Sequence, residues 1–321
     1  MRCIHILIGL VGLLLVACVS RANAAGSSVL TVYGAGTLAV PFRQLDALFE
    51  QQHPGVTVQP EFGGSVMLAR KITDLHQRAD VLAVADYHVI PKYLFAADGR
   101  NAYADWYIGF AGNAITFAYT DKSKYAKNVT SQNWYEVLAR PGVEIGRSNP
   151  ETDPSGYQTL QMLSLAEKAY SAPGLAARVL ANAPLTNMRD TETSLISALQ
   201  LGQIDYLAIY RSDAIQHKLN YIRLPAKIDL RNPDDAGLYK AGIAHTKNGD
   251  LPGKPIVYAI TIPSSAPQPT LAEQYIALLL SPQGQQIMER NGFRSIAPAI
   301  GVNVVKMPAS VRVAVKLWPA W

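Results

Sequence analysis

Cysteine is almost absent from this chain, because its 321 residues contain only Cys3 and Cys18. Both lie in a short leading segment that precedes the alternating strand and helix patterns. The rest of the chain therefore has no disulfide and no thiol chemistry, and it must rely on an apolar core for stability. With 49% hydrophobic residues, it is long enough to form two lobes that each bury such a core.

Long hydrophobic runs are also scarce, and the one that stands out is Ile4 to Ala17, just after Arg2. It is too short for a comfortable membrane span and is typical of a signal peptide, so we expect residues 1–24 to direct export to the periplasm. Two processing patterns compete there. Ala22-Asn-Ala24 is a small-x-small cleavage site, whereas Leu15-Val-Ala-Cys18 resembles a lipobox whose cysteine would carry a lipid anchor.

The chain also lacks a strong excess of either charge. Removing a leader that contains Arg2 and Arg21 takes two charges from the formal net charge of +5 and leaves +3. The remaining basic residues are scattered, so we expect no nucleic-acid partner. Gly-x-Ser-x-Gly, phosphate-binding P-loop and Ser/His/Asp patterns are missing, and the histidines have no metal-ligand spacing. We therefore expect a protein that is not an enzyme and has no cofactor.

Strand-like and helical runs alternate along the chain, which predicts an α/β fold with parallel sheets and helices on both faces. Two strand-like stretches, 114–120 and 256–262, are interpreted as crossings between lobes. They assign residues 27–113 and 263–321 to the first lobe and residues 114–262 to the second.

Two strand-to-helix junctions in the first lobe indicate an anion site. Val29 to Tyr33 is a strand pattern that runs into Gly34-Ala-Gly-Thr37, and Thr37 is placed to cap the next helix. A second strand pattern runs into Gly63-Gly64-Ser65 and another helix. Free backbone N–H groups and the positive end of a helix dipole favour anions. One junction alone is a weak signal, but two in one lobe could converge on one small anion.

The second lobe contains a polar run, Ser148 to Tyr157, between a strand pattern and a helix pattern. Asp153 in this run is either an N-cap or a carboxylate that faces the cleft between the lobes. Glu192 starts a later helix pattern and can also approach the cleft. Arg211 either reaches an anion or forms a structural ion pair.

Several ordered runs resemble the archaeal-type molybdate/tungstate-binding proteins of ABC importers, and the resemblance extends from about Leu30 to Pro298. The runs are Tyr103 to Tyr107, Ala118 to Tyr125, Asn133 to Tyr135, Ser148 to Tyr157, Ile204 to Ser212 and Lys254 to Tyr258. The resemblance implies a two-lobed type II periplasmic-binding-protein fold that clamps a small oxyanion. It also implies an importer's membrane permease as partner, and we expect a monomer.

The resemblance further implies which residues hold the oxyanion. The hydroxyl positions of the family match Thr37 and Ser65. Two carboxylates complete a six-coordinate metal centre in the family, and the first matches Asp153. The second is a glutamate in the family and falls by spacing on Asp234, with Asp235 as its rival. Aspartate is one methylene shorter than glutamate, so the backbone must shift to make this second bond, or the bond is missing.

Coordination chemistry explains why carboxylates would surround a dianion. Two carboxylates beside a bound dianion repel it unless they bond its central atom. Molybdenum(VI) and tungsten(VI) are hard centres that accept two more oxygen ligands, whereas sulfur in sulfate does not. The residues do not rank molybdate against tungstate. A receptor for another tetrahedral oxyanion, such as phosphate or sulfate, and a periplasmic hydrolase remain the alternatives.

Overall fold

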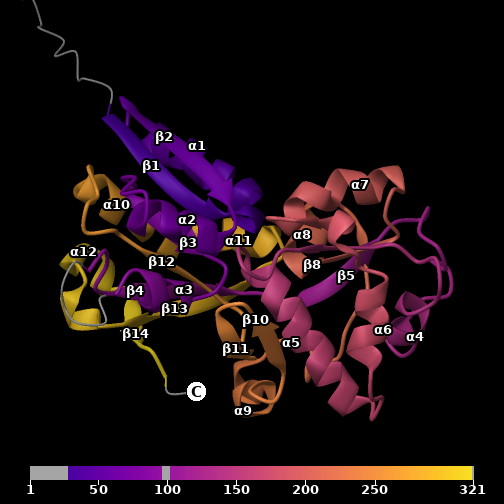
Figure 1. The fold of residues 1–321 in the computed structure, drawn as a ribbon. Coiled ribbons are helices and arrows are strands. Elements are labelled where there is room, and N and C mark those ends of the chain that lie inside the picture. The colour runs from indigo at the N-terminus through magenta and orange to yellow at the C-terminus, as the bar shows by residue number, and fades with distance from the viewer. Residues whose placement is uncertain (1–27, 96–101, 320–321) are drawn as a thin grey trace, which may run out of the picture.

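A computed structural model describes residues 28–95 and 102–319. The predicted leader, with Cys18 and the site at Ala24, lies outside the described residues. Two lobes lie side by side, the first from both ends of the chain and the second from its middle (Figure 1). Across the described ranges, we find no helix with the length and apolar character needed to cross a membrane.

A seven-stranded sheet forms the centre of the first lobe, in the order β14-β13-β4-β12-β3-β1-β2. Its strands are β1 (Ser28–Ala35), β2 (Val56–Gly63), β3 (Val81–Val84), β4 (Tyr107–Gly112), β12 (Val257–Thr261), β13 (Arg294–Val302) and β14 (Val315–Leu317). The helices of this lobe are α1 (Ala39–Gln52), α2 (Ser65–Thr73), α3 (Val89–Tyr93), α10 (Pro269–Leu280), α11 (Pro282–Arg290) and α12 (Ala309–Arg312). The 3-10 turns η1 (Gly36–Leu38) and η5 (Val304–Lys306) complete it.

A five-stranded sheet forms the centre of the second lobe, in the order β7-β6-β8-β5-β9. Its strands are β5 (Ile115–Tyr119), β6 (Ile145–Ser148), β7 (Met188–Arg189), β8 (Tyr206–Tyr210) and β9 (Asn220–Tyr221). The helices are α4 (Trp134–Leu138), α5 (Pro154–Ala169), α6 (Leu175–Ala181), α7 (Ile196–Leu201), α8 (Arg211–Gln216) and α9 (Ala236–Tyr239), with 3-10 turns η2 (Leu185–Asn187), η3 (Glu192–Leu195) and η4 (Pro233–Asp235). A separate hairpin pairs β10 (Ile243–Thr246) with β11 (Gly249–Pro252).

The sheets are mixed rather than parallel throughout, which corrects the expectation from β/α alternation. Strand β1 is parallel to β2 and β3, but β12 is antiparallel to both β3 and β4. Strand β12 also lies inside the first sheet, although residues 256–262 were predicted to close the second lobe. The chain has therefore already returned to the first lobe at Val257, because both neighbours of β12 are first-lobe strands.

Helix α1 shows how the apolar pattern becomes packing. Phe42, Leu45 and Phe49 recur with helical spacing, and all three are buried, as the sequence predicts. Tyr275 of α10 meets the rings of Phe42 and Phe49 edge-on, with centroids 6.0 and 5.4 Å away. The face of α1 that follows the first junction is thereby fixed against the C-terminal helices.

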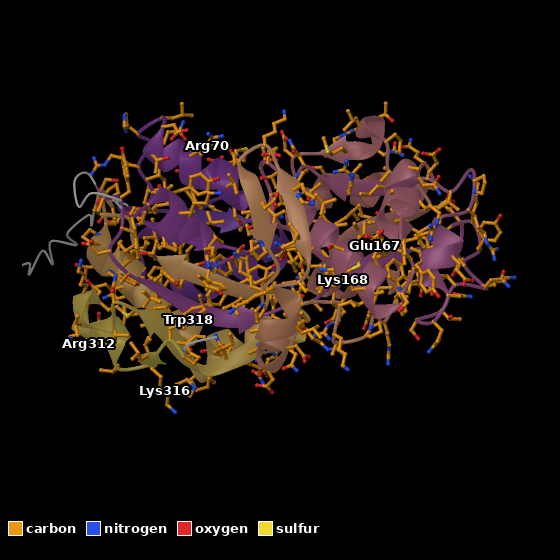
Figure 2. The ribbon with its side chains drawn as sticks, turned by 60° about the horizontal axis from the view of Figure 1, so that its bottom comes forward. Arg70, Glu167, Lys168, Arg312, Lys316 and Trp318 are labelled. Atoms are coloured by element: carbon orange, nitrogen blue, oxygen red, sulfur yellow. The ribbon has the colours of Figure 1, made fainter. Side chains whose placement is uncertain are left out.

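The end of the chain covers one edge of the first lobe. Trp318 packs against Tyr87 and Tyr107, with ring centroids 4.6 and 5.4 Å apart, while Lys316 extends away from the lobe (Figure 2). A Cβ at Gly109 would lie 2.7 Å from the Trp318 ring, so this strand position has no room for a side chain.

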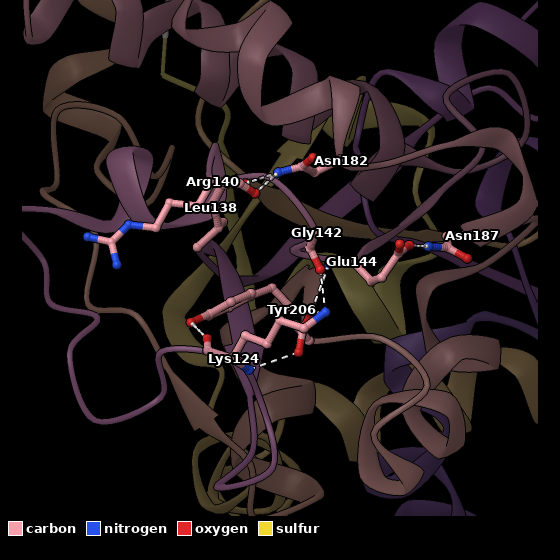
Figure 3. A network of polar contacts seen from close by, with 9 residues as sticks. Lys124, Leu138, Arg140, Gly142, Glu144, Asn182, Asn187 and Tyr206 are labelled. Carbon is pink, nitrogen blue, oxygen red and sulfur yellow. Dashed lines mark hydrogen bonds and ion pairs between the residues drawn. The ribbon is translucent and has the colours of Figure 1, made fainter.

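A polar network holds the start of β6 in the second lobe (Figure 3). The buried Asp205 carboxylate accepts the N–H groups of Lys124 at 2.8 Å and Glu144 at 2.9 Å. The Tyr206 hydroxyl donates to the Lys124 carbonyl at 2.7 Å. Because β6 leads directly into the polar run that contains Asp153, this network helps to fix the position of that run.

Candidate functional site

The two predicted junctions of the first lobe both face the second lobe at very short range. A Cβ built on Gly36 would lie 3.0 Å from the Thr193 hydroxyl. One built on Gly64 would lie 2.6 Å from the Thr152 carbonyl oxygen. The Met67 N–H donates to that same carbonyl across the lobes at 3.4 Å. The first junction thus lies against the segment of Thr193, and the second against that of Thr152.

Thr37 belongs to the first junction but does not cap a helix, so that part of the prediction is wrong. It lies inside η1, and α1 begins two residues later without a side-chain cap. Its buried hydroxyl instead lies 3.0 Å from the hydroxyl of Tyr258 on β12. The 3-10 turn rotates the side chain of Thr37 away from the start of α1 and toward the crossing between the lobes.

Tyr258 joins Thr37 to a chain of hydrogen bonds at this crossing. Asn113 donates to the Tyr258 hydroxyl at 3.2 Å and to the Ser212 hydroxyl at 2.8 Å. Asn113 precedes β5, where the chain leaves the first lobe, and Ser212 lies on α8 of the second lobe. Polar contacts therefore connect the first junction to the second lobe through the hinge.

Ser65 is the first residue of α2 and is fully buried. Its oxygen accepts the N–H of Ala85 at 3.0 Å. This bond uses a lone pair of the oxygen and leaves the hydroxyl hydrogen free to donate to a ligand.

Asp153 occupies the N-cap position of α5 and is buried, and its carboxylate belongs to a wider polar cluster. The Ser155 hydroxyl lies 2.6 Å from Asp153 Oδ2 and 2.9 Å from Glu192 Oε2. Ser148 completes this group, because its hydroxyl oxygen is 2.5 Å from that of Ser155. We call Asp153, Glu192, Ser155 and Ser148 the carboxylate cluster.

Burial makes the charged forms of these acids costly. It raises the pKa of Asp153, although hydrogen bonds from Glu192, Ser155 and Ser148 act in the opposite direction. Burial and then repulsion from Asp153 raise the pKa of Glu192 well above its ordinary value. The two carboxyl groups therefore favour sharing a proton over carrying two charges.

Asp213 on α8 is a third buried acid beside the cluster. Both of its carboxylate oxygens are buried without a hydrogen-bond partner among the described residues. Burial, and to a smaller extent repulsion from Asp153, raises the pKa of Asp213 well above its ordinary value. Three acids thus face the region where the lobes meet, and a bound group must either take up their charge or accept their protons.

The structure does not bring Asp234 to the carboxylate cluster. Asp234 is exposed at η4, where its N–H bonds the Asn232 side chain at 3.2 Å. Asp235 accepts from the Asn232 side-chain amide at 2.9 Å. Glu192 lies beside Asp153 instead, and it also begins η3, as its sequence pattern predicts. The assignment of Asp234 or Asp235 as the second carboxylate ligand, which was drawn from the family spacing, stays a prediction.

A second set of contacts ties the lobes together next to the cluster. The Tyr157 hydroxyl on α5 donates to Asp86 Oδ2 at 2.6 Å, and Lys254 Nζ lies 3.1 Å from the same oxygen. Burial alone would raise the pKa of Asp86, but Lys254, His88 and Tyr157 outweigh it and lower that pKa. Sequence reasoning missed Asp86 because nothing in its local pattern predicts that it would meet α5.

The site has the chemistry to hold a small oxyanion. First-lobe hydroxyls and N–H groups are donors, and the second-lobe acids can either donate a proton or bond a hard central atom. In the described ranges, no three histidine, cysteine, aspartate or glutamate residues are arranged to bind a metal ion.

This fold and site define a binding protein, and the chain belongs to the bacterial extracellular solute-binding protein family, whose model matches residues 30–294. An uncharacterized solute-binding protein of Petrotoga mobilis is 41% identical over 290 residues, which cover 88% of each chain. The molybdate/tungstate-binding protein WtpA of Pyrococcus abyssi is 37% identical over 299 residues, covering 84% of this chain and 86% of WtpA. These relatives confirm the family resemblance seen in the sequence.

Solved structures confirm the predicted two-lobed fold. The periplasmic molybdate-binding protein of Azotobacter vinelandii matches with a TM-score of 0.61 at 20% identity, covering 82% of this chain and 98% of that one. The sulfate-binding protein SubI of Mycobacterium tuberculosis matches with a TM-score of 0.59 at 15% identity, covering 88% and 89%. At these identities the likeness shows the fold alone.

Proposed function

We propose that this protein captures molybdate or tungstate between its lobes and delivers the anion to the membrane permease of an ABC importer. The observation that carries the proposal is that both first-lobe junctions lie against the second-lobe segments that hold two buried acids. Gly64 lies against the carbonyl groups of Thr152 and Asp190, which flank Asp153 and Glu192 in the chain, and Gly36 lies against Thr193, next to Glu192. The 37% identity with WtpA, which is named for these two anions, supports the same ligand class.

Asp153 and Glu192 are the best pair for coordinating the central atom. Two buried carboxylates share the Ser155 hydroxyl. Burial raises the pKa of both, and repulsion from Asp153 raises the pKa of Glu192 further. Bonding to molybdenum(VI) or tungsten(VI) removes that repulsion, because a hard metal centre accepts oxygen donors. Glu192 is a glutamate, which is the residue type of the second carboxylate in the family. Asp234 has a shorter side chain and is exposed.

A plain tetrahedral oxyanion is the second candidate, and the same raised pKa values favour it. A carboxyl group that keeps its proton is a hydrogen-bond donor, so protonated Glu192 or Asp213 could bind phosphate or sulfate without any metal bond. The two candidates differ in pH dependence. Binding through proton donors weakens as pH rises and the acids ionise, whereas coordination needs the ionised carboxylates.

Calorimetric titration of residues 25–321 with molybdate, tungstate, sulfate and phosphate tests the proposal. We expect molybdate and tungstate to bind at least about 100-fold more tightly than sulfate, a difference of about 2.7 kcal/mol. Equal affinity for all four anions would refute metal coordination and favour the second candidate. No binding of any of them would refute both.

Export to the periplasm and partnership with a permease follow from the same proposal. The family is described as extracellular, and the first 24 residues have the pattern of a signal peptide. Mass spectrometry of the exported protein distinguishes a free N-terminus at Ala25 from a lipid on Cys18.

A further inference from the structure

A polar cavity on the hinge side of the second lobe lies apart from the carboxylate cluster. Its volume is about 490 Å³, and it is formed by the start of β5, the first residue of α8, the segment after β9 and the loop at residues 229–231. We call it the hinge cavity, because one of its walls, the loop at residues 229–231, bonds both crossings between the lobes. The Ile115 N–H donates to the Asp229 carbonyl at 3.0 Å, and the Ile256 N–H donates to the Leu230 carbonyl at 2.8 Å.

Arginines dominate the charge of the hinge cavity. Arg211, Arg223 and Arg231 line it, and Asp229 is the one acid among its lining residues. Arg231 already uses that acid, because its Nη1 lies 2.6 Å from Asp229 Oδ2 and its N–H bonds Asp229 Oδ1 at 3.1 Å. The lining residues therefore have a formal net charge of +2.

Arg211 has a buried side-chain nitrogen that is not hydrogen-bonded. Its Nε is buried and makes no hydrogen bond within the described part of the chain. Its backbone N–H bonds the Ala114 carbonyl at 2.9 Å, which fixes the residue at the hinge. A buried guanidinium N–H without an acceptor is unfavourable, and an oxygen atom of a ligand in the cavity would accept its hydrogen bond.

Helix α8 separates this cavity from the proposed ligand site. Arg211 and Asp213 are two residues apart, and successive helical residues are rotated by about 100°, so the two side chains leave α8 in nearly opposite directions. Arg211 lines the hinge cavity, whereas Asp213 lies beside Asp153. None of the carboxylate cluster lines the hinge cavity.

We propose that the hinge cavity binds a second ligand, a small dianion of the dicarboxylate or phosphate kind. The planar guanidinium group matches the paired oxygens of carboxylates and phosphates, and the guanidinium groups of Arg211 and Arg223 can balance two negative charges. The cavity is also larger than a bare tetrahedral oxyanion needs, and Ile115, Ile222 and Leu224 give it an apolar wall for a short carbon chain. Burial raises the pKa of Asp229 to about 7, which leaves less negative charge to oppose the ligand.

Titration with succinate and, separately, with inorganic phosphate tests this site, and the two arms distinguish the sources of the dianion. We expect one of them to bind the full-length mature protein, and neutral succinamide to show no binding. Arg211→Gln should weaken that binding about tenfold or more, and exposed Arg223→Gln should weaken it less. Arg312→Gln, which removes the same charge from an exposed position on α12, should leave it unchanged.

The Asp153→Asn variant separates this proposal from the function proposed above. Binding to the hinge cavity should survive Asp153→Asn and be lost in Arg211→Gln, while tungstate binding should show the reverse. The proposal is overturned if neither dianion binds, if succinamide binds as well as succinate, or if the binding is lost in Asp153→Asn and kept in Arg211→Gln. The melting temperature of each variant, and the Arg223→Gln result, show whether Arg211→Gln has merely unfolded the protein.

Discussion

Ser155 has one hydroxyl hydrogen, yet its oxygen is in hydrogen-bonding range of three other oxygens. Asp153 Oδ2, Glu192 Oε2 and the Ser148 hydroxyl lie 2.6, 2.9 and 2.5 Å away. Ser148 has its own hydroxyl hydrogen, which can go to the Ser155 oxygen, but the one hydrogen of Ser155 cannot satisfy two carboxylates. A proton on one of the two acids therefore stabilises the cluster, in line with their raised pKa values. The cluster therefore stores a proton that a ligand must displace or use, and ligand binding should be coupled to proton exchange.

Replacing Asp153 by asparagine tests the central residue of the cluster. Asn keeps the shape and a carbonyl oxygen but removes the charge, so tungstate affinity should fall about 100-fold, equivalent to about 2.7 kcal/mol. Sulfate affinity should hold or improve, because a source of repulsion has gone. Stability without ligand should not fall, because the Asp153 side chain makes no cap hydrogen bond to α5 and its charge is costly to bury. Calorimetry checks the affinities, and unchanged tungstate affinity would mean that Asp153 does not bind the metal.

The identity of the second carboxylate is a separate prediction. We expect Glu192→Gln to weaken tungstate binding as strongly as Asp153→Asn, because both acids share the Ser155 hydroxyl. Asp234→Asn and Asp235→Asn serve as controls at the positions predicted from spacing. X-ray absorption should find six oxygens around tungsten in the wild type and fewer in Glu192→Gln. Loss of binding in Asp234→Asn alone would restore the assignment from the sequence.

Local pattern explains which site residues could be found in the sequence. Thr37, Ser65 and Asp153 each stand where a strand pattern ends and a helix pattern begins, so their neighbourhood marks them. Glu192 and Asp213 carry no such mark, because their burial depends on how η3 and α8 pack against the first lobe. Counting residues from a family motif selected Asp234, but a count does not show whether a loop is exposed.

At the scale of elements, the contact between α5 and the end of β3 holds the lobes together. Tyr157→Phe removes the hydroxyl that bonds Asp86 across the lobes at 2.6 Å. Because this bond forms only when the lobes meet, its loss should make tungstate dissociate about fivefold faster. That rate change corresponds to a free energy within the usual ~0.5–1.5 kcal/mol for a hydrogen bond. Stopped-flow fluorescence measures the rate. Tyr170→Phe is the matched control, because its hydroxyl bonds Trp134 within the second lobe; an equal effect there would contradict the prediction.

The packing of α1 against α10 predicts a pH dependence of stability. Asp46 accepts the Tyr275 hydroxyl at 2.7 Å, and burial raises its pKa from 3.8 to about 6. The folded state holds this proton in a pH range where the unfolded chain has lost it. The stabilising contribution is thus complete below about pH 4 and is lost as pH rises through about 6.

Asp46→Asn should remove this loss, so its stability relative to wild type should increase between about pH 4 and about pH 8. A shift of this size corresponds to on the order of 1–3 kcal/mol. Urea unfolding at several pH values measures it, and exposed Asp121→Asn is the control. A constant difference between Asp46→Asn and wild type across this range would show that Asp46 does not titrate in the folded protein.

Element-level prediction succeeded where periodicity was strong and failed where burial was uniform. Helix α1 follows the helical pattern after the first junction, because one face of it is buried and the other is not. Strand β1 contains the predicted strand Val29 to Tyr33. Strand β4 is buried along its whole length, so it has no alternation to detect. Strand β13 contains Pro298 and small residues, and its pairing with β4 depends on residues almost two hundred positions away.

For the whole molecule, we predict that the lobes close around the ligand by rotating about the hinge. Small-angle scattering should show a smaller radius of gyration with tungstate than without it. Gly64→Ala should prevent this, because its Cβ would lie 2.6 Å from the Thr152 carbonyl when the lobes meet. Gly237→Ala is the matched control, since a Cβ there meets nothing within 4 Å. A radius that falls equally in Gly64→Ala would contradict this closure geometry.

The order of the strands also affects how the protein is made. Strand β4 lies between β12 and β13 in the first sheet, and both of those strands come from the last third of the chain. A chain that emerges from its N-terminus therefore cannot complete this sheet until residue 317 is available, whereas the five strands of the second sheet lie within residues 115–221. Such late, long-range pairing slows folding. It would keep the first lobe unfolded during synthesis, which is the form that a translocation channel for extended polypeptides accepts.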